Sequence, residues 1–139
     1  MAVDSMLAID YRPDPSGDDH VRISVRGRGF LGHSDQVTSA KAIGDFADAL
    51  ARKPFGAEAK LWIGEESDNG PAIRINVKPM DSPDKFRVWT QMADVREHGC
   101  RISTWFSVTA GDLRAFSIAL KTAVADGGFA ELKGIGDLN

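Results

Sequence analysis

The run Gly27–Gly32 matches the G-x-G-x-x-G pattern of dinucleotide-binding loops. In such loops the glycines let backbone N–H groups approach phosphates at the start of a helix. The strand before this run carries Arg22 and Arg26 on one face, whereas a central parallel strand is covered on both faces and is nearly all apolar. Asp35 would also sit close to any bound pyrophosphate. The residues therefore favour a bend with Phe30 as a core anchor, and leave a small-molecule or nucleotide site as an alternative.

A cysteine and a histidine lie two positions apart, at Cys100 and His98. An extended chain places both side chains on the same side, which would allow a nucleophile with a neighbouring base. Cys100 falls on the inward side of its predicted strand, however, where a cysteine usually packs as a small apolar residue. The other histidines, His20 and His33, show no metal-ligand spacing. No catalytic residue, metal or cofactor is expected, and an enzyme site near Cys100 and His98 remains an alternative.

The three tryptophans of the chain provide the strongest binding signal. Strand periodicity places each of them opposite apolar neighbours that point toward the core. Several arginines share the predicted outer side, and tryptophan and arginine are enriched at binding hot spots. The candidate partner-binding residues are Trp62, Trp89, Trp105, Arg22, Arg74, Arg87 and Arg101. The alternative is that the tryptophans cover one another, stack under arginines or lie beneath the C-terminal tail.

Alternating apolar and polar residues predict the strands that carry these side chains. They occur at residues 7–11, 20–26, 59–64, 72–78, 86–94 and 100–108. Turn-forming residues at hairpin spacing connect the last four stretches, which favours an antiparallel meander.

Two segments show helical periodicity, at Thr38–Arg52 and Thr109–Ala125. Thr38 or Ser39 can cap the first helix, and Thr109 with Asp112 fits a capping box for the second. The strands offer one continuously apolar face, so both helices should cover it. The sequence thus predicts an α+β fold, with an antiparallel twisted sheet of about five to six strands and two helices packed on one face.

The predicted elements repeat weakly. Arg22-Ile23-Ser24 precedes a helical run that ends in Phe46 to Leu50, and Arg101-Ile102-Ser103 precedes one that contains Phe116 to Leu120. The repeat indicates that a strand followed by a helix occurs twice around one sheet. It is information about the fold and does not identify a substrate. A single domain over residues 1–139 is expected, with an N-terminal strand and loop at 1–19 and a tail at 129–139 that adds a short strand or is flexible.

The composition is that of a globular domain of 139 residues, with a formal net charge of -3 and a pI of about 5.5. It lacks the basic excess that is typical of nucleic-acid-binding domains, so no nucleic-acid partner is expected. One cysteine allows no internal disulfide, and the chain shows neither a signal peptide nor a membrane-spanning run. These features favour a cytoplasmic, bacterial-type protein that does not bind membranes.

The segment from Trp105 to Val108, followed by Asp112 to Phe116 and Leu120, resembles the strand-to-helix pattern of small bacterial α+β families, including some immunity proteins of polymorphic toxin systems. Phe30-Leu31-Gly32, Phe46, Leu50 and Ala59-Lys60-Leu61 are similar to the same pattern near the start of such domains. The resemblance spans about Val21 to Leu120. It implies a non-enzymatic protein-interaction domain, immunity-like or regulatory, that binds another protein. The exposed tryptophans would also suit a second copy of the chain in a homodimer.

Overall fold

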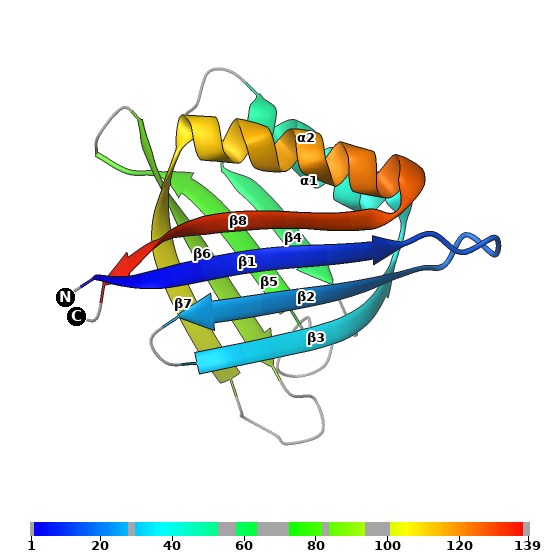
Figure 1. Cartoon of the computed structure of the whole chain (residues 1–139), viewed down its shortest axis with the longest axis horizontal. Coiled ribbons are helices and arrows are strands. Elements are labelled where there is room, and N and C mark those ends of the chain that lie inside the picture. The colour runs from blue at the N-terminus through cyan, green and yellow to red at the C-terminus, as the bar shows by residue number, and fades with distance from the viewer. Residues whose placement is uncertain are drawn as a thin grey trace.

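The computed structural model describes residues 2–27, 30–52, 58–63, 73–81, 84–93 and 101–137 (Figure 1). Within these residues the elements are β1 (Ala2–Arg12), β2 (Asp19–Gly27), β3 (Phe30–Thr38), α1 (Ala40–Ala51), β4 (Ala59–Ile63), β5 (Ile73–Pro79), β6 (Lys85–Ala93), β7 (Arg101–Thr109), α2 (Ala110–Asp126) and β8 (Gly128–Asp137). The strands form one antiparallel sheet in the order β3-β2-β1-β8-β7-β6-β5-β4. An α+β fold with an antiparallel sheet is confirmed, but the predicted five to six strands are wrong, because the sheet has eight.

The two further strands are β3, which the sequence did not predict, and β8, which it predicted only as a short strand in place of a flexible tail. The inner positions of β3 are Gly32, Ser34 and Gln36, opposite buried residues of β2, so β3 has no apolar alternation to recognise. The C-terminal residues form β8, which lies inside the sheet between β1 and β7. The tail is therefore part of the sheet and does not lie over the tryptophans.

The sheet consists of two four-stranded halves. β8, β1, β2 and β3 run across the front in Figure 1, and β4 to β7 run obliquely behind them. In the described residues, the pairing that joins the halves is Ser107 of β7 with Ile135 of β8. Both halves lead into a helix, α1 after β3 and α2 after β7. β1 and β8 pair along their length, from Tyr11 with Gly128 to Ala2 with Asp137, which brings the two ends of the chain side by side (Figure 1).

A spacing of 70 residues relates the two helices. Ser117 Oγ of α2 donates a hydrogen bond of 2.6 Å to the carbonyl oxygen of Ala47 in α1, which lies 70 residues earlier. Phe46 and Phe116 are related by the same spacing and are both buried. The two helices therefore pack against each other through corresponding positions of the repeat. The helix part of the sequence repeat is therefore real.

The strand part of that repeat does not match. Arg22 lies in β2, two elements before α1, whereas Arg101 lies in β7, directly before α2. The structural counterpart of β7 is β3, which directly precedes α1. The two Arg-Ile-Ser triplets are thus similar in sequence but occupy different strands of their halves.

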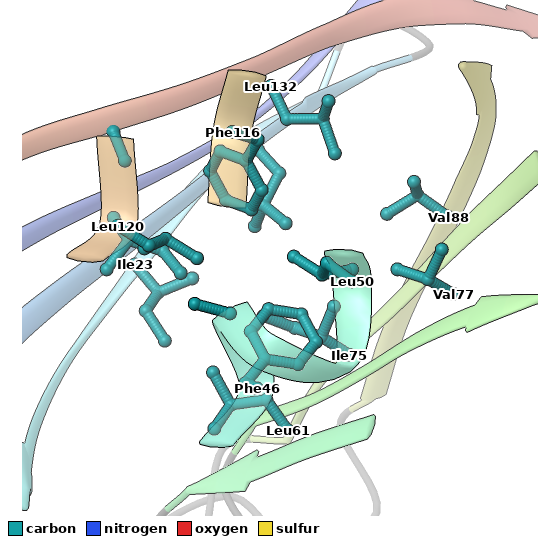
Figure 2. Close-up of a cluster of buried hydrophobic side chains, with 14 of the residues drawn as sticks. Ile23, Phe46, Leu50, Leu61, Ile75, Val77, Val88, Phe116, Leu120 and Leu132 are labelled. Atoms are coloured by element: carbon teal, nitrogen blue, oxygen red, sulfur yellow. The ribbon is translucent and has the colours of Figure 1, made fainter. Parts of the chain in front are cut away.

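The core fills the space between the halves and the helices. Figure 2 shows Phe46 and Leu50 of α1, and Phe116 and Leu120 of α2, among apolar side chains from both halves of the sheet. Ser39 caps α1, and Thr109 and Asp112 form the predicted capping box of α2.

A buried hydrogen bond fixes the β1–β2 turn. The Tyr11 hydroxyl donates to the carboxylate of Asp19, whose Oδ1 also accepts from the backbone N–H of Asp14 at 2.8 Å. Burial raises the pKa of the Tyr11 hydroxyl, and the hydrogen bond from Tyr11 lowers the pKa of Asp19. The ionised carboxylate therefore keeps its role over the physiological pH range.

Gly134 of β8 lies where the two halves meet. A Cβ at this position would clash with the Ser107 carbonyl oxygen and lie 2.5 Å from the Phe106 ring. We expect Gly134→Ala to lower the free energy of unfolding by about 1–3 kcal/mol, because the backbone cannot move aside cheaply. Urea denaturation followed by circular dichroism measures this change.

Gly44 of α1 provides the matched control, because a Cβ there meets nothing within 4 Å. Gly44→Ala is expected to raise the free energy of unfolding by up to about 1 kcal/mol, since alanine favours a helix over glycine. If Gly134→Ala proved as stable as the parent protein, the close approach of β7 and β8 would be wrong.

Candidate functional site

The outer face of β4 to β7 carries all three tryptophans. Leu61 and Ile63 are buried on the inner side of β4, whereas Trp62 between them is 53% exposed. Trp89 of β6 and Trp105 of β7 are half-buried, and each lies between buried neighbours on its own strand. The alternation of burial along each strand places the three rings on one side of the sheet.

Strand register brings these side chains into neighbouring pairs. Trp89 lies opposite Trp105 on one side and opposite Asn76 on the other. Trp62 lies opposite Arg74. Directly opposite residues of an antiparallel pair are separated by about 4.5–5.5 Å between their Cβ atoms, so their side chains interact. The aromatic residues therefore form part of one continuous surface, here called the tryptophan face.

The tryptophan face is strongly cationic. Along the described residues of β4 to β7, its outward positions carry Lys60, Arg74, Lys78, Lys85 and Arg87. Glu58, just before β4, is the acidic residue on this side in the described part of the chain, and its Oε1 lies 3.6 Å from Lys60 Nζ and 3.7 Å from Lys78 Nζ. The face thus has a local positive excess, although the whole chain has a net charge of -3.

Cations already lie over two of the tryptophan rings. The Arg74 guanidinium carbon is 5.0 Å from the Trp62 ring centroid, and Lys60 Nζ is 5.6 Å from it. The Arg87 guanidinium carbon is 4.8 Å from the Trp105 centroid. Such contacts hold the cations at the sheet surface and align the rings. Among the described side chains, none places a cation over the Trp89 ring.

A hollow of about 380 Å³ adjoins Trp89, and it is lined by Asn76, Lys78, Arg87 and Trp89. Asn76 Oδ1 is buried and has no hydrogen-bond partner in the described part of the chain. The same is true of Arg74 Nε, on the same strand. Buried polar atoms without a partner are uncommon in folded proteins and call for an explanation. The tryptophan face therefore combines an open ring, cations and an unused acceptor.

The outer face of the other half differs in charge. Its larger hollow, of about 740 Å³, is lined by paired charges such as Arg22 and Asp35. Arg22 Nε and Nη2 donate to the Asp35 carboxylate at 2.7 and 3.1 Å, which lowers the pKa of Asp35 and raises that of Arg22. Arg22 therefore lies in a different half from the tryptophans. Of the other candidates, Arg74 and Arg87 lie on the tryptophan face, and the Arg101 side chain lies outside the described residues.

The glycine run Gly27–Gly32 does not lie at the start of a helix, where a phosphate-binding loop would have to lie. Gly27 ends β2 and Phe30 begins β3, so the glycine run belongs to a hairpin connection, and α1 begins only at Ala40. A phosphate site at a helix N-terminus is therefore absent from these described residues. The side chain of Phe30, and the whole of His98 and Cys100, lie outside the described residues.

The described residues contain no group of three or more histidine, cysteine or acidic side chains that could hold a metal ion. His20 and His33 are exposed on the outer sides of β2 and β3. Within the same residues, neither helix is long and apolar enough to cross a membrane.

Sequence reasoning missed Asn76, Lys60, Lys78 and Lys85 as members of the site. The signal was present in the sequence, because each of these residues has the same strand parity as one of the candidate tryptophans or arginines.

The overall architecture has known counterparts. The fold is shared with a plant transcriptional regulator. The structure of the plant transcriptional regulator PBF-2 matches 88% of this chain and 75% of its own, with a TM-score of 0.52 and 10% sequence identity. WHY3 from Arabidopsis thaliana matches 88% of this chain and 79% of its own, with a TM-score of 0.50 and 10% identity. No protein-family model and no curated protein sequence matches the chain.

These neighbours contradict the predicted function. The predicted protein-interaction module and the expectation of no nucleic-acid partner are wrong, because the solved structures that share this fold include a plant transcriptional regulator. The expectation of no nucleic-acid partner was based on the net charge of the whole chain, and that sum does not show the positive excess of the tryptophan face. The resemblance to small bacterial families, immunity proteins among them, stays a prediction.

Proposed function

We propose that this protein binds single-stranded nucleic acid on the tryptophan face of β4 to β7. The observation that carries the proposal is the composition of that face: three tryptophans and five cations, against one carboxylate in the described residues. Aromatic rings stack with unpaired bases, at about 1–3 kcal/mol per base, while lysine and arginine track the phosphates. The likeness to a plant transcriptional regulator supports the same ligand class.

The geometry favours a single strand over a duplex. The rings emerge from the surface of a sheet, where they can reach only bases whose faces are free. In a duplex those faces are stacked on each other, so only the cations of this surface could make contact. The net negative charge of the chain is compatible with the proposal, because charges beyond about 10 Å are largely screened at 0.1 M salt.

Trp89→Ala provides the direct test. We expect the variant to bind a 15-nucleotide single strand, DNA or RNA, about tenfold more weakly in fluorescence anisotropy, because the uncovered ring is removed. Phe129→Ala is the matched control, because Phe129 is 59% exposed but lies on β8, in the other half. Equal affinity of the parent protein for a single strand and for a duplex of the same length would count against the proposal, as would an unchanged affinity of Trp89→Ala.

A cytoplasmic location, as the sequence suggested, agrees with this ligand class and remains a prediction. The face offers stacking surfaces and cations, which act by binding, and an enzymatic role is no part of the proposal.

A further inference from the structure

The three rings of the tryptophan face differ in what lies against them. Cations of this chain lie over the Trp62 and Trp105 rings, whereas no described side chain places a cation over the Trp89 ring. Trp89 is also the tryptophan that lines the hollow of about 380 Å³, together with Lys78 and Arg87. The hollow is therefore the place on this face where a base can stack on an open ring.

Strand register explains how Arg87 reaches Trp105. Trp105 of β7 lies directly opposite Trp89, and Arg87 lies two residues before Trp89 on the same face of β6. Arg87 is thus the diagonal neighbour of Trp105, at a separation that a long side chain can span. Its guanidinium carbon lies 4.8 Å from the centroid of the Trp105 ring. Because Arg87 also lines the hollow, its cation lies beside a base that stacks on Trp89.

The ring holds Arg87 in a way that preserves its charge. The Arg87 side chain is exposed, and no carboxylate of the described residues forms an ion pair with it. On the other half of the sheet, Arg22 is held by Asp35, whose carboxylate neutralises it. An indole ring attracts a guanidinium through its quadrupole and carries no net charge. Trp105 can therefore hold Arg87 and leave the full positive charge for a phosphate.

We infer that Trp105 is a positioning residue that acts through Arg87, whose guanidinium it keeps beside the hollow for the phosphate of the nucleotide stacked on Trp89. This inference rests on the proposed function and gives two of its tryptophans different roles. Trp89 contacts the base, and Trp105 contacts the cation. A side chain that is ordered before binding costs less conformational entropy when the ligand arrives.

The test compares two DNA strands of the same length and charge. One has 15 thymidine nucleotides, and the other has 15 abasic sugar phosphates, which offer no base to stack. The parent protein is expected to bind the thymidine strand about tenfold more tightly in fluorescence anisotropy, and Trp89→Ala should bind both strands equally. Trp105→Leu removes the ring and keeps an apolar side chain. We expect it to bind both strands about fivefold more weakly and to keep the tenfold ratio.

A double-mutant cycle shows whether Trp105 acts through Arg87. In an Arg87→Ala background, Trp105→Leu should cause no further loss of affinity, because the group that the ring holds is already absent. Trp105→Phe retains a ring and should retain most of the affinity of the parent protein. Trp62→Leu is the matched control, since the cations over that ring are Lys60 and Arg74, and its effect should be the same with or without Arg87. Trp105→Thr, a residue favoured in strands, replaces Trp105→Leu if the latter does not fold.

The outcomes separate this inference from the proposed function. If the parent protein binds neither strand, the proposed function is wrong and the role of Trp105 falls with it. If Trp105→Leu lowers the ratio between the two strands, or weakens binding in the Arg87→Ala background, Trp105 contacts the nucleic acid itself. Nucleic-acid binding then stands and the positioning role is overturned. An unchanged affinity of Trp105→Leu for both strands would overturn it as well.

Discussion

Phe116→Ala is expected to lower the free energy of unfolding by about 3–5 kcal/mol, because it removes a large side chain from the centre of the core. Phe116 is 2% exposed and lies on α2, between apolar residues of both halves of the sheet (Figure 2). Phe46→Ala should have an effect of similar size, since Phe46 occupies the equivalent place on α1 and is also 2% exposed. Guanidinium chloride denaturation measures both changes.

The control for these substitutions is Phe129→Ala, which removes the same side chain from an exposed position on β8. Its free energy of unfolding should change by no more than about 0.5 kcal/mol. If the denaturation midpoint of Phe46→Ala or Phe116→Ala were the same as that of the parent protein, the burial of that side chain between its helix and the sheet would be wrong.

Reversing two charges on the tryptophan face should have the largest effect on binding. The double variant Lys78→Glu/Arg87→Glu is expected to bind a single strand about 100-fold more weakly at low salt, since it turns attraction of phosphates into repulsion. The slope of log affinity against log salt should also become shallower, by about 0.7 for each phosphate that the protein no longer neutralises. Anisotropy titrations at several salt concentrations give both quantities.

The matched control reverses two charges in the other half of the sheet. Arg12 and Arg26 are exposed there, on β1 and β2. The variant Arg12→Glu/Arg26→Glu has the same net charge as the first but should retain most of the affinity. If the two double variants were weakened equally, binding would depend on the overall charge of the protein, and the tryptophan face would not be the site.

Most of the fold could be predicted because most elements bury one face. The alternation around Ile23, or around Val88, reflects a strand with one side in the core, and the capping box at Thr109 marks a helix start that needs no tertiary context. β3 was missed because its inner positions with described side chains are Gly32, Ser34 and Gln36, which give no apolar alternation. β8 was predicted only as an alternative to a flexible tail, because its glycines resemble a flexible end, whereas Gly134 is required by the close approach of β7.

The candidate site could be predicted only in part. Strand parity places Trp62 and Arg74 on an outer face, but parity does not tell which half of the sheet a strand joins. Arg22 was therefore grouped with the tryptophans, although the fold places it beside Asp35 in the other half. Net charge was misleading for a related reason, because it sums over the whole chain, including the many carboxylates that lie off the tryptophan face.

The position of β8 also dictates the order in which the protein can assemble as it is made. This strand pairs with β1, at the opposite end of the sequence, and it joins the two halves through Ile135. When synthesis has reached the end of α2, β1 is still an unpaired edge strand. The strand pairing through β8 that joins the two halves of the sheet has not yet formed. Closure must wait until residues 128–137 leave the ribosome, and contacts between such distant segments form slowly. The fold is thus completed only after β8 has been synthesised, and until then the open edge of β1 can pair with other chains.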